Sequence, residues 1–92
     1  MSRAFTTENA GSWGDPSYRV VLPPREDPGF DAAAADAILE AARAGQTGSA
    51  EMATGYYWGE PRLFGEVRAI LERARAADDE RLVELCERYL QM

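Results

Sequence analysis

The sequence has no histidine, no lysine and only one cysteine among its 92 residues. Without histidine it lacks a Ser-His or Cys-His nucleophile pair, a histidine general base and a histidine metal ligand. The single Cys86 excludes an internal disulfide and a cysteine-rich zinc site, and it favours a reducing compartment. Gly45, Gly48 and Gly55 have neither the spacing nor the preceding strand of a phosphate-binding loop. These absences predict a protein that is not an enzyme and that has no catalytic residue, cofactor or metal.

Long apolar runs and positive charge are also scarce. The first eight residues lack the apolar core of a signal peptide, and no stretch approaches the ~20 apolar residues of a membrane span. Sixteen acidic side chains outnumber ten arginines, which gives a net charge of −6. Such a surface repels phosphate backbones and anionic membranes. We therefore expect a cytoplasmic protein that binds neither nucleic acid nor membranes directly.

The most informative feature that is present is a short repeat. Residues 38–44 read Ile-Leu-Glu-Ala-Ala-Arg-Ala, and residues 70–76 read Ile-Leu-Glu-Arg-Ala-Arg-Ala, with six of seven positions identical. Both copies lie late in a helix-like apolar pattern, and a second helix-like segment follows each one. This is the pattern of two helical hairpins, an arrangement that binds partners more often than it carries chemistry.

The chain is short enough for one domain with a modest core. Residues 1–16 are rich in Ser, Thr, Asn and Gly, which predicts a flexible tail. Residues 17–29 contain a short β-prone run ended by Pro23-Pro24, which predicts an extended arm. Residues 30–92 form the helical domain. We predict an all-α fold of about four helices, arranged as two antiparallel helical hairpins with an extended N-terminal arm.

Residue types at the helix ends predict the boundaries. Asp27 before a proline is an N-cap type for the first helix, and Gly45 ends that helix. Thr47 or Ser49 caps the second helix, and Asp78 caps the fourth.

Two boundaries are less sharply marked. The second helix is expected to run toward Tyr57 unless it breaks at Gly55, where glycine costs about 1 kcal/mol relative to alanine. The third helix is expected to start at Pro61.

Apolar side chains at helical spacing predict the core. Cys86 lies on the stripe of the fourth helix, so it is expected to be an inert buried thiol. The predicted stripes are Phe30, Ala34, Ala37, Ile38 and Ala41 in the first helix, Leu63, Val67, Ile70, Leu71 and Ala74 in the third, and Leu82, Leu85, Cys86, Tyr89 and Leu90 in the fourth.

The segment between the hairpins holds three consecutive aromatic residues. They cannot all face the core from one helix, so at least one is expected at the surface. Exposed Tyr, Trp and Arg side chains are typical of protein-binding hot spots. The alternative is a hinge whose aromatic rings fold inward. The candidate partner-binding residues are Trp13, Tyr56, Tyr57, Trp58 and Arg62.

Three carboxylates flank the same segment. Glu51, Glu60 and Glu66 could pair as a general acid and base. Acidic residues on solvated helix faces are expected at this composition, so the simpler interpretation is that these side chains are solvent-facing.

The 32-residue offset and the helical hairpins resemble the tetratricopeptide type of repeat, whose period is about 34 residues. The likeness covers residues 30–91 and is carried by the repeated Ile-Leu-Glu-x-Ala-Arg-Ala segment and by small residues such as Ala50 and Ala53. The large-aromatic and small-residue positions of that family are not reproduced in order. The resemblance implies a helical scaffold for a protein partner.

A second resemblance covers residues 1–25. The run Met-Ser-Arg-Ala-Phe at the start, Glu8, and the later Leu-Pro-Pro-Arg at 22–25 resemble the leader of some bacterial transcript-cleavage factors of the Gre type. Those factors enter the secondary channel of RNA polymerase with a long coiled coil that bears acidic residues at its tip. No helix expected here is long enough for that coiled coil. The resemblance therefore implies association with the polymerase and not cleavage.

Taken together, these features predict a non-enzymatic intracellular protein–protein interaction module or small adaptor. Its partner is another protein or a second copy of the chain in a homodimer. One alternative is an acidic regulator associated with RNA polymerase or another nucleic-acid-handling machine. A further alternative is an enzyme that depends on the carboxylates of Glu51, Glu60 or Glu66.

Overall fold

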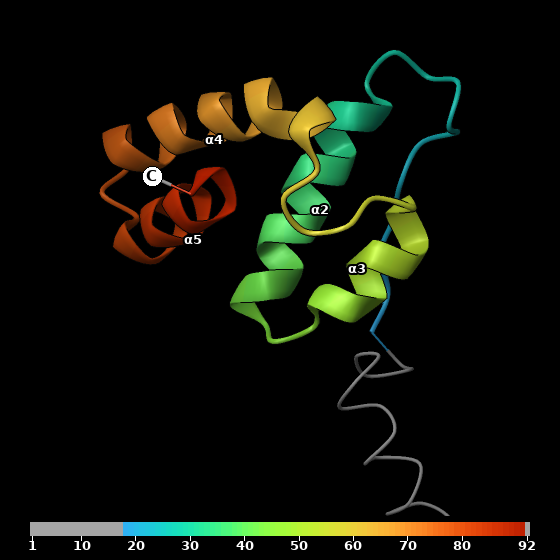
Figure 1. Ribbon diagram of the computed structural model, residues 1–92, viewed down its shortest axis with the longest axis horizontal. Helices are drawn as coiled ribbons and strands as arrows, with labels where there is room; N and C mark the ends of the chain where they lie inside the picture. Colours follow the sequence, from blue (N-terminus) through green and yellow to red (C-terminus); the bar gives the residue numbers. More distant parts are fainter. Residues whose placement is uncertain (1–17, 92) are drawn as a thin grey trace, which may run out of the picture.

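The computed structural model describes residues 18–91 (Figure 1). Within this range the chain is all-α and contains no strand, which confirms the predicted fold class. The elements are α2 (Phe30–Arg43), α3 (Thr47–Thr54), the 3₁₀ turn η1 (Pro61–Leu63), α4 (Phe64–Ala76) and α5 (Glu80–Leu90).

The helices form the two predicted hairpins, with α2 packed on α3 and α4 packed on α5. Helix α2 is central, because it also contacts α4, α5 and η1. Figure 1 shows α2 between α3 and the pair formed by α4 and α5. None of the helices in residues 18–91 is long and apolar enough to cross a membrane.

The first copy of the repeat forms the end of α2. Ile38 and Leu39 are buried, and the helix is followed by Gly45 with a φ of 74°. The Gly45 amide donates to the Ala42 carbonyl, and the next amide donates to the Ala41 carbonyl. These two bonds satisfy carbonyls of the last turn that have no partner within the helix. Glycine adopts the left-handed backbone conformation at this position without strain. The predicted role of Gly45 is confirmed.

The second copy ends α4 in the same way with a different residue. Asp78 takes the left-handed position, with a φ of 56°, and its amide donates to the Arg75 carbonyl. The following amide, from Asp79, donates to the Ala74 carbonyl. Because Asp78 closes α4, it does not cap α5. The N-cap of α5 is Asp79, whose side chain accepts from the Leu82 amide, so the assignment of Asp78 as the cap was wrong by one residue.

The other predicted caps also shift. The N-cap of α2 is Gly29, and Asp27 instead accepts from the Gly29 amide in the turn before the helix. The N-cap of α3 is Gln46, so neither Thr47 nor Ser49 has that role.

Two boundaries lie near the chain's middle. Helix α3 breaks at Gly55 and does not continue toward Tyr57. Pro61 starts η1, and α4 begins only at Phe64.

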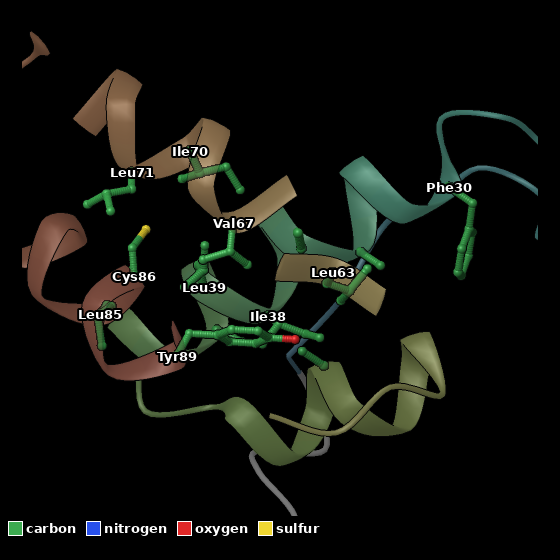
Figure 2. Packing of buried hydrophobic residues seen from close by; sticks show 14 residues of the cluster. Phe30, Ile38, Leu39, Leu63, Val67, Ile70, Leu71, Leu85, Cys86 and Tyr89 are labelled. Atoms are coloured by element: carbon green, nitrogen blue, oxygen red, sulfur yellow. The ribbon is translucent and has the colours of Figure 1, made fainter. Parts of the chain in front are cut away.

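The core fills the space between α2, α4 and α5 (Figure 2). Ile38, Leu63, Val67 and Tyr89 are fully buried, as the stripes predicted. Leu39 is also buried, because α2 packs on helices at more than one of its faces. Figure 2 shows the labelled side chains converging between the helices, with Phe30 set apart at the other end of α2.

Some members of the predicted stripes are only half-buried: Ala37, Leu82 and Leu90. Cys86 is fully buried, and this burial raises the pKa of its thiol.

The arm lies on the helical domain as an extended segment. Its side chains alternate: Tyr18, Val20 and Leu22 pack against the core, whereas Val21 is exposed. This period of two is that of an extended chain, and it holds without strand pairing in the described part. Further along, Arg25 donates from Nη2 to the Thr54 carbonyl at 2.6 Å, which ties the arm to the end of α3.

Candidate functional site

The candidate site is the segment of residues 55–60, here called the aromatic loop, which connects α3 to η1. Its conformation depends on Gly55 and Gly59, whose φ values are 78° and 91°. The entry to the loop is fixed by Thr54, which is fully buried. The Thr54 hydroxyl donates to the Ala50 carbonyl at 2.8 Å and accepts from the Tyr56 amide at 3.1 Å. These two hydrogen bonds fix the backbone at the point where the loop leaves α3.

Tyr56 is half-buried and faces the start of α2. Its hydroxyl donates to Oδ1 of Asp31 at 2.7 Å, and its ring lies 6.3 Å from the ring of Phe30. Arg62 lies near this hydroxyl: the Tyr56 side chain, and then the charge of Asp31, raise the pKa of the Arg62 guanidinium. Two predicted site residues, Tyr56 and Arg62, are thus brought together.

Arg25, an exposed residue of the arm, lies over the rings of Phe30 and Tyr56. Its guanidinium carbon lies 4.9 Å from the ring centre of Phe30 and 5.9 Å from that of Tyr56. A cation over an aromatic face is attracted by the ring. Together with the bond to Thr54, these contacts hold the first half of the aromatic loop against the arm and α2.

Trp58 anchors the second half of the loop. Its ring is half-buried and meets the ring of Tyr89 edge-on, with 5.0 Å between the centres. Its amide donates to Oε2 of Glu51 at 2.9 Å. Tyr89 in turn donates its hydroxyl to the Glu60 carbonyl at 3.0 Å. Trp58 is therefore packed inward, as the hinge alternative expected for part of this segment.

Tyr57 lies between these two anchored neighbours and points away from the domain, with 76% of its surface exposed. The expectation that at least one of the three aromatic residues faces solvent is confirmed. The structure therefore does not put all the predicted residues on one surface. Tyr57 is outward, Tyr56 and Arg62 form a polar cluster, and Trp58 packs on Tyr89. Trp13 lies outside the described residues.

Two of the three carboxylates near the loop accept hydrogen bonds from backbone amides. Glu51 accepts from the Trp58 amide, and the Glu60 side chain accepts from the Arg62 amide at 3.3 Å. Glu66 lies in the first turn of α4. Within residues 18–91, no group of three or more acidic or cysteine side chains is placed to hold a metal ion.

Sequence reasoning missed two residues that shape the loop. Arg25 and Asp31 each contact a residue more than twenty positions away, Thr54 and Tyr56 respectively. Arg25 ends the Leu-Pro-Pro-Arg run at 22–25 and Asp31 lies in the first turn of α2, but nothing local to either residue indicates its distant partner.

Comparisons with known protein families, with curated proteins and with solved structures find no match to this chain. The two resemblances given above stay predictions. Any functional conclusion therefore rests on the geometry of the aromatic loop and on the chain's charge.

Proposed function

We propose that this protein is a non-enzymatic protein–protein interaction module and that Tyr57 is the centre of its contact surface. The observation that carries the proposal is the contrast between Tyr57 and its neighbours. Tyr57 is 76% exposed, while Tyr56 and Trp58 are each held by a hydrogen bond and a ring contact. An exposed aromatic side chain on a fixed backbone can enter a partner's pocket without the cost of ordering a loop.

The residue types around Tyr57 support the same proposal. Tyr, Trp and Arg are the residues most enriched at binding hot spots. Arg62 is exposed, and its guanidinium lies near Tyr56. The exposed Tyr57 offers a partner an apolar anchor, and the exposed Arg62, five residues further along the chain, offers a polar contact.

Affinity capture from the native host's lysate tests the proposal, with captured proteins quantified for each variant. The Tyr57→Ala variant is expected to lose its partner while its free energy of unfolding stays within about 0.5 kcal/mol of wild type. The matched control is Met52→Ala, because Met52 is an exposed apolar side chain (69%) on α3. The control variant is expected to capture the same protein as wild type. Equal capture by Tyr57→Ala and wild type would exclude Tyr57 as the contact centre.

In this proposal the partner of Tyr57 is either another protein or a second copy of the chain. Sedimentation of the purified chain over a range of concentrations measures self-association directly. If the chain forms a homodimer through Tyr57, the Tyr57→Ala variant sediments as a monomer at concentrations where wild type is a dimer.

A second candidate function is supported by the charge. With a net charge of −6, the chain suits a basic partner, such as an exposed arginine- or lysine-rich face of RNA polymerase or of another nucleic-acid-handling machine. Salt separates the two candidates. Affinity that falls steeply between low and high ionic strength favours the acidic regulator, whereas affinity that changes little favours an apolar contact at Tyr57.

A further inference from the structure

Helix α3 is attached to the rest of the fold through one neighbouring helix. Among the helices of residues 18–91 it contacts α2 and neither α4 nor α5, and Figure 1 shows it on the side of α2 away from those two helices. Of its eight residues, two small ones, Ala50 and Thr54, are buried. By comparison, α2 has six buried residues and α4 has four. Because apolar burial is the main stabilising term in a fold, α3 is held weakly by packing.

The sequence of α3 adds little helical stability of its own. It reads Thr-Gly-Ser-Ala-Glu-Met-Ala-Thr, and the Thr, Gly and Ser residues that make up half of it are weak helix formers. An isolated helix shorter than about 12 residues is marginal in water. The helix is flanked by Gly45 and Gly55, whose φ values are 74° and 78°. Glycine at both ends lets the backbone change direction there at little cost.

Hydrogen bonds from outside the helix hold α3 where packing does not. Arg25 donates to the Thr54 carbonyl at 2.6 Å. The Trp58 amide donates to Glu51 at 2.9 Å, and the Tyr56 amide donates to the Thr54 hydroxyl at 3.1 Å. The last two bonds come from the aromatic loop, which is the direct continuation of α3. Arg25 belongs to the arm, so its bond ties α3 to a separate segment of the chain.

The arm holds Arg25 in position independently of α3. Leu22 packs against the core, and the two prolines that follow it have fixed φ angles. The Asp27 amide donates to the Pro24 carbonyl at 2.9 Å, which closes a turn around Arg25. The Arg25 guanidinium also lies over the ring of Phe30 on α2. Because these anchors are on the arm and on α2, they do not require α3 to stay in place.

We propose that α3 is a lid on α2 that opens between Gly45 and Gly55 while α2, α4 and α5 stay packed, and that Arg25 is the latch that holds it closed. In the open state the aromatic loop loses the two side chains of α3 that accept from its amides. The lid therefore controls how firmly the loop is held. This inference concerns the closure of the fold and does not require Tyr57 to be a contact centre.

Native-state hydrogen exchange of the full chain tests the proposal, measured for each amide by NMR at low denaturant concentrations. The free energy of an opening and its denaturant slope identify the amides that open together. The α3 amides are expected to exchange through an opening with a lower free energy and a smaller slope than the opening that exposes the α4 and α5 amides. One free energy and one slope for all three helices would overturn the proposal, because the fold would then open as a single unit.

A core variant separates the lid from the core. Ile70 is buried on α4, a helix that α3 does not contact. Ile70→Val is expected to lower the protection of the best-protected α4 and α5 amides about fivefold, since it removes a buried methyl group. The α3 amides are expected to keep their wild-type protection, because the core is still packed when the lid is open. An equal loss of protection at α3 would contradict a separate lid.

A change at Arg25 tests the latch. Arg25→Ala is expected to lower the protection of the α3 amides about tenfold, the effect of losing a hydrogen bond from a charged donor. The matched control is Arg73→Ala, because Arg73 is an exposed arginine on α4, 3.9 Å from Asp36. The control is expected to leave the protection of α3 unchanged.

Two results would remove Arg25 from this role. In one, α3 opens by itself but is protected equally in Arg25→Ala and in wild type, so that the arm is not the latch. In the other, circular dichroism shows that Arg25→Ala is unfolded throughout, so that Arg25 holds the whole domain and not the lid.

Discussion

The Arg43 side chain, at the end of α2, places Nη2 2.8 Å from Oδ2 of Asp79, the N-cap of α5. Arg43 belongs to the first copy of the repeat, so this pair joins the two hairpins. Its counterpart in the second copy, Arg75, lies 3.5 Å from Glu87 and stays within its own hairpin. The Asp79 carboxylate therefore both pairs with Arg43 and caps α5, where it accepts from the Leu82 amide.

Acid is expected to weaken this junction. The hydrogen bond from Arg43 and that from the Leu82 amide lower the pKa of the Asp79 carboxyl. An unfolded aspartate has a pKa of about 3.9. Because the folded value is lower, the stabilisation is complete above about pH 4 and is lost as the pH falls through the folded pKa. Wild type should therefore lose more of its free energy of unfolding between about pH 7 and pH 3 than Asp79→Asn does.

Denaturant unfolding at the two pH values measures this difference. Asp36→Asn is the matched control, because Asp36 is an exposed carboxylate 3.9 Å from Arg73. That variant should keep the acid sensitivity of wild type. An Asp79→Asn variant that keeps the full acid sensitivity would mean that the junction contributes nothing to it.

Gly55 and Gly45 provide a matched pair for the contact between Arg25 and the aromatic loop. Both are left-handed, with φ values of 78° and 74°. A Cβ at Gly45 meets nothing within 4 Å, whereas a Cβ at Gly55 lies 2.5 Å from Nη2 of Arg25. Gly45→Ala should therefore cost only the backbone penalty of about 1–2 kcal/mol. Gly55→Ala should cost more, since it also displaces Arg25 from the Thr54 carbonyl.

The double variant Arg25→Ala with Gly55→Ala identifies the cause of the extra cost. In the Arg25→Ala background, Gly55→Ala should cost about as much as Gly45→Ala does, because the clash is gone. Thermal or denaturant unfolding of the four variants gives the coupling. Equal costs for the two glycine changes in the wild-type background would show that Arg25 moves aside freely.

Trp58 and Tyr57 should separate stability from binding. Trp58 packs on the buried ring of Tyr89, so Trp58→Ala should lower the free energy of unfolding by about 2 kcal/mol or more. Tyr57→Ala should change it by less than about 0.5 kcal/mol, since the side chain is exposed. Unfolding curves for the two variants, measured with their capture of the partner, test this assignment. A large loss of stability in Tyr57→Ala would place that ring in the fold and not in an interface.

Local signals predicted much of this fold. The spacing of Ile38, Val67 and Leu85 identified the buried faces, and Gly45 identified the end of α2, because both depend only on near neighbours in the chain. The N-cap of α5 was misplaced by one residue for a reason that sequence does not reveal. Asp78 and Asp79 are the same residue type, and only the left-handed backbone at Asp78 decides which of them caps.

The candidate site was harder to predict, because its parts meet only through the tertiary fold. The exposure of one aromatic residue followed from their being consecutive, but which one is exposed did not. That outcome depends on Tyr89 receiving Trp58 and on Asp31 receiving Tyr56, and both partners lie 25 residues or more away in sequence. Arg25 was missed for the same reason.

Alkaline pH should destabilise the fold through Tyr89. Burial, and then the nearby charge of Glu60, raise the pKa of the Tyr89 hydroxyl to about 12. An unfolded tyrosine has a pKa of about 10, so above that pH the unfolded chain loses a proton that the folded chain keeps. The free energy of unfolding should therefore fall as the pH rises from about 10 to about 12.

In Tyr89→Phe this part of the slope should be absent, although the change itself costs about 1 kcal/mol because the Glu60 carbonyl loses its donor. Tyr57→Phe, at an exposed site, should keep the wild-type slope, and a Tyr89→Phe variant with that same slope would contradict the assignment to Tyr89.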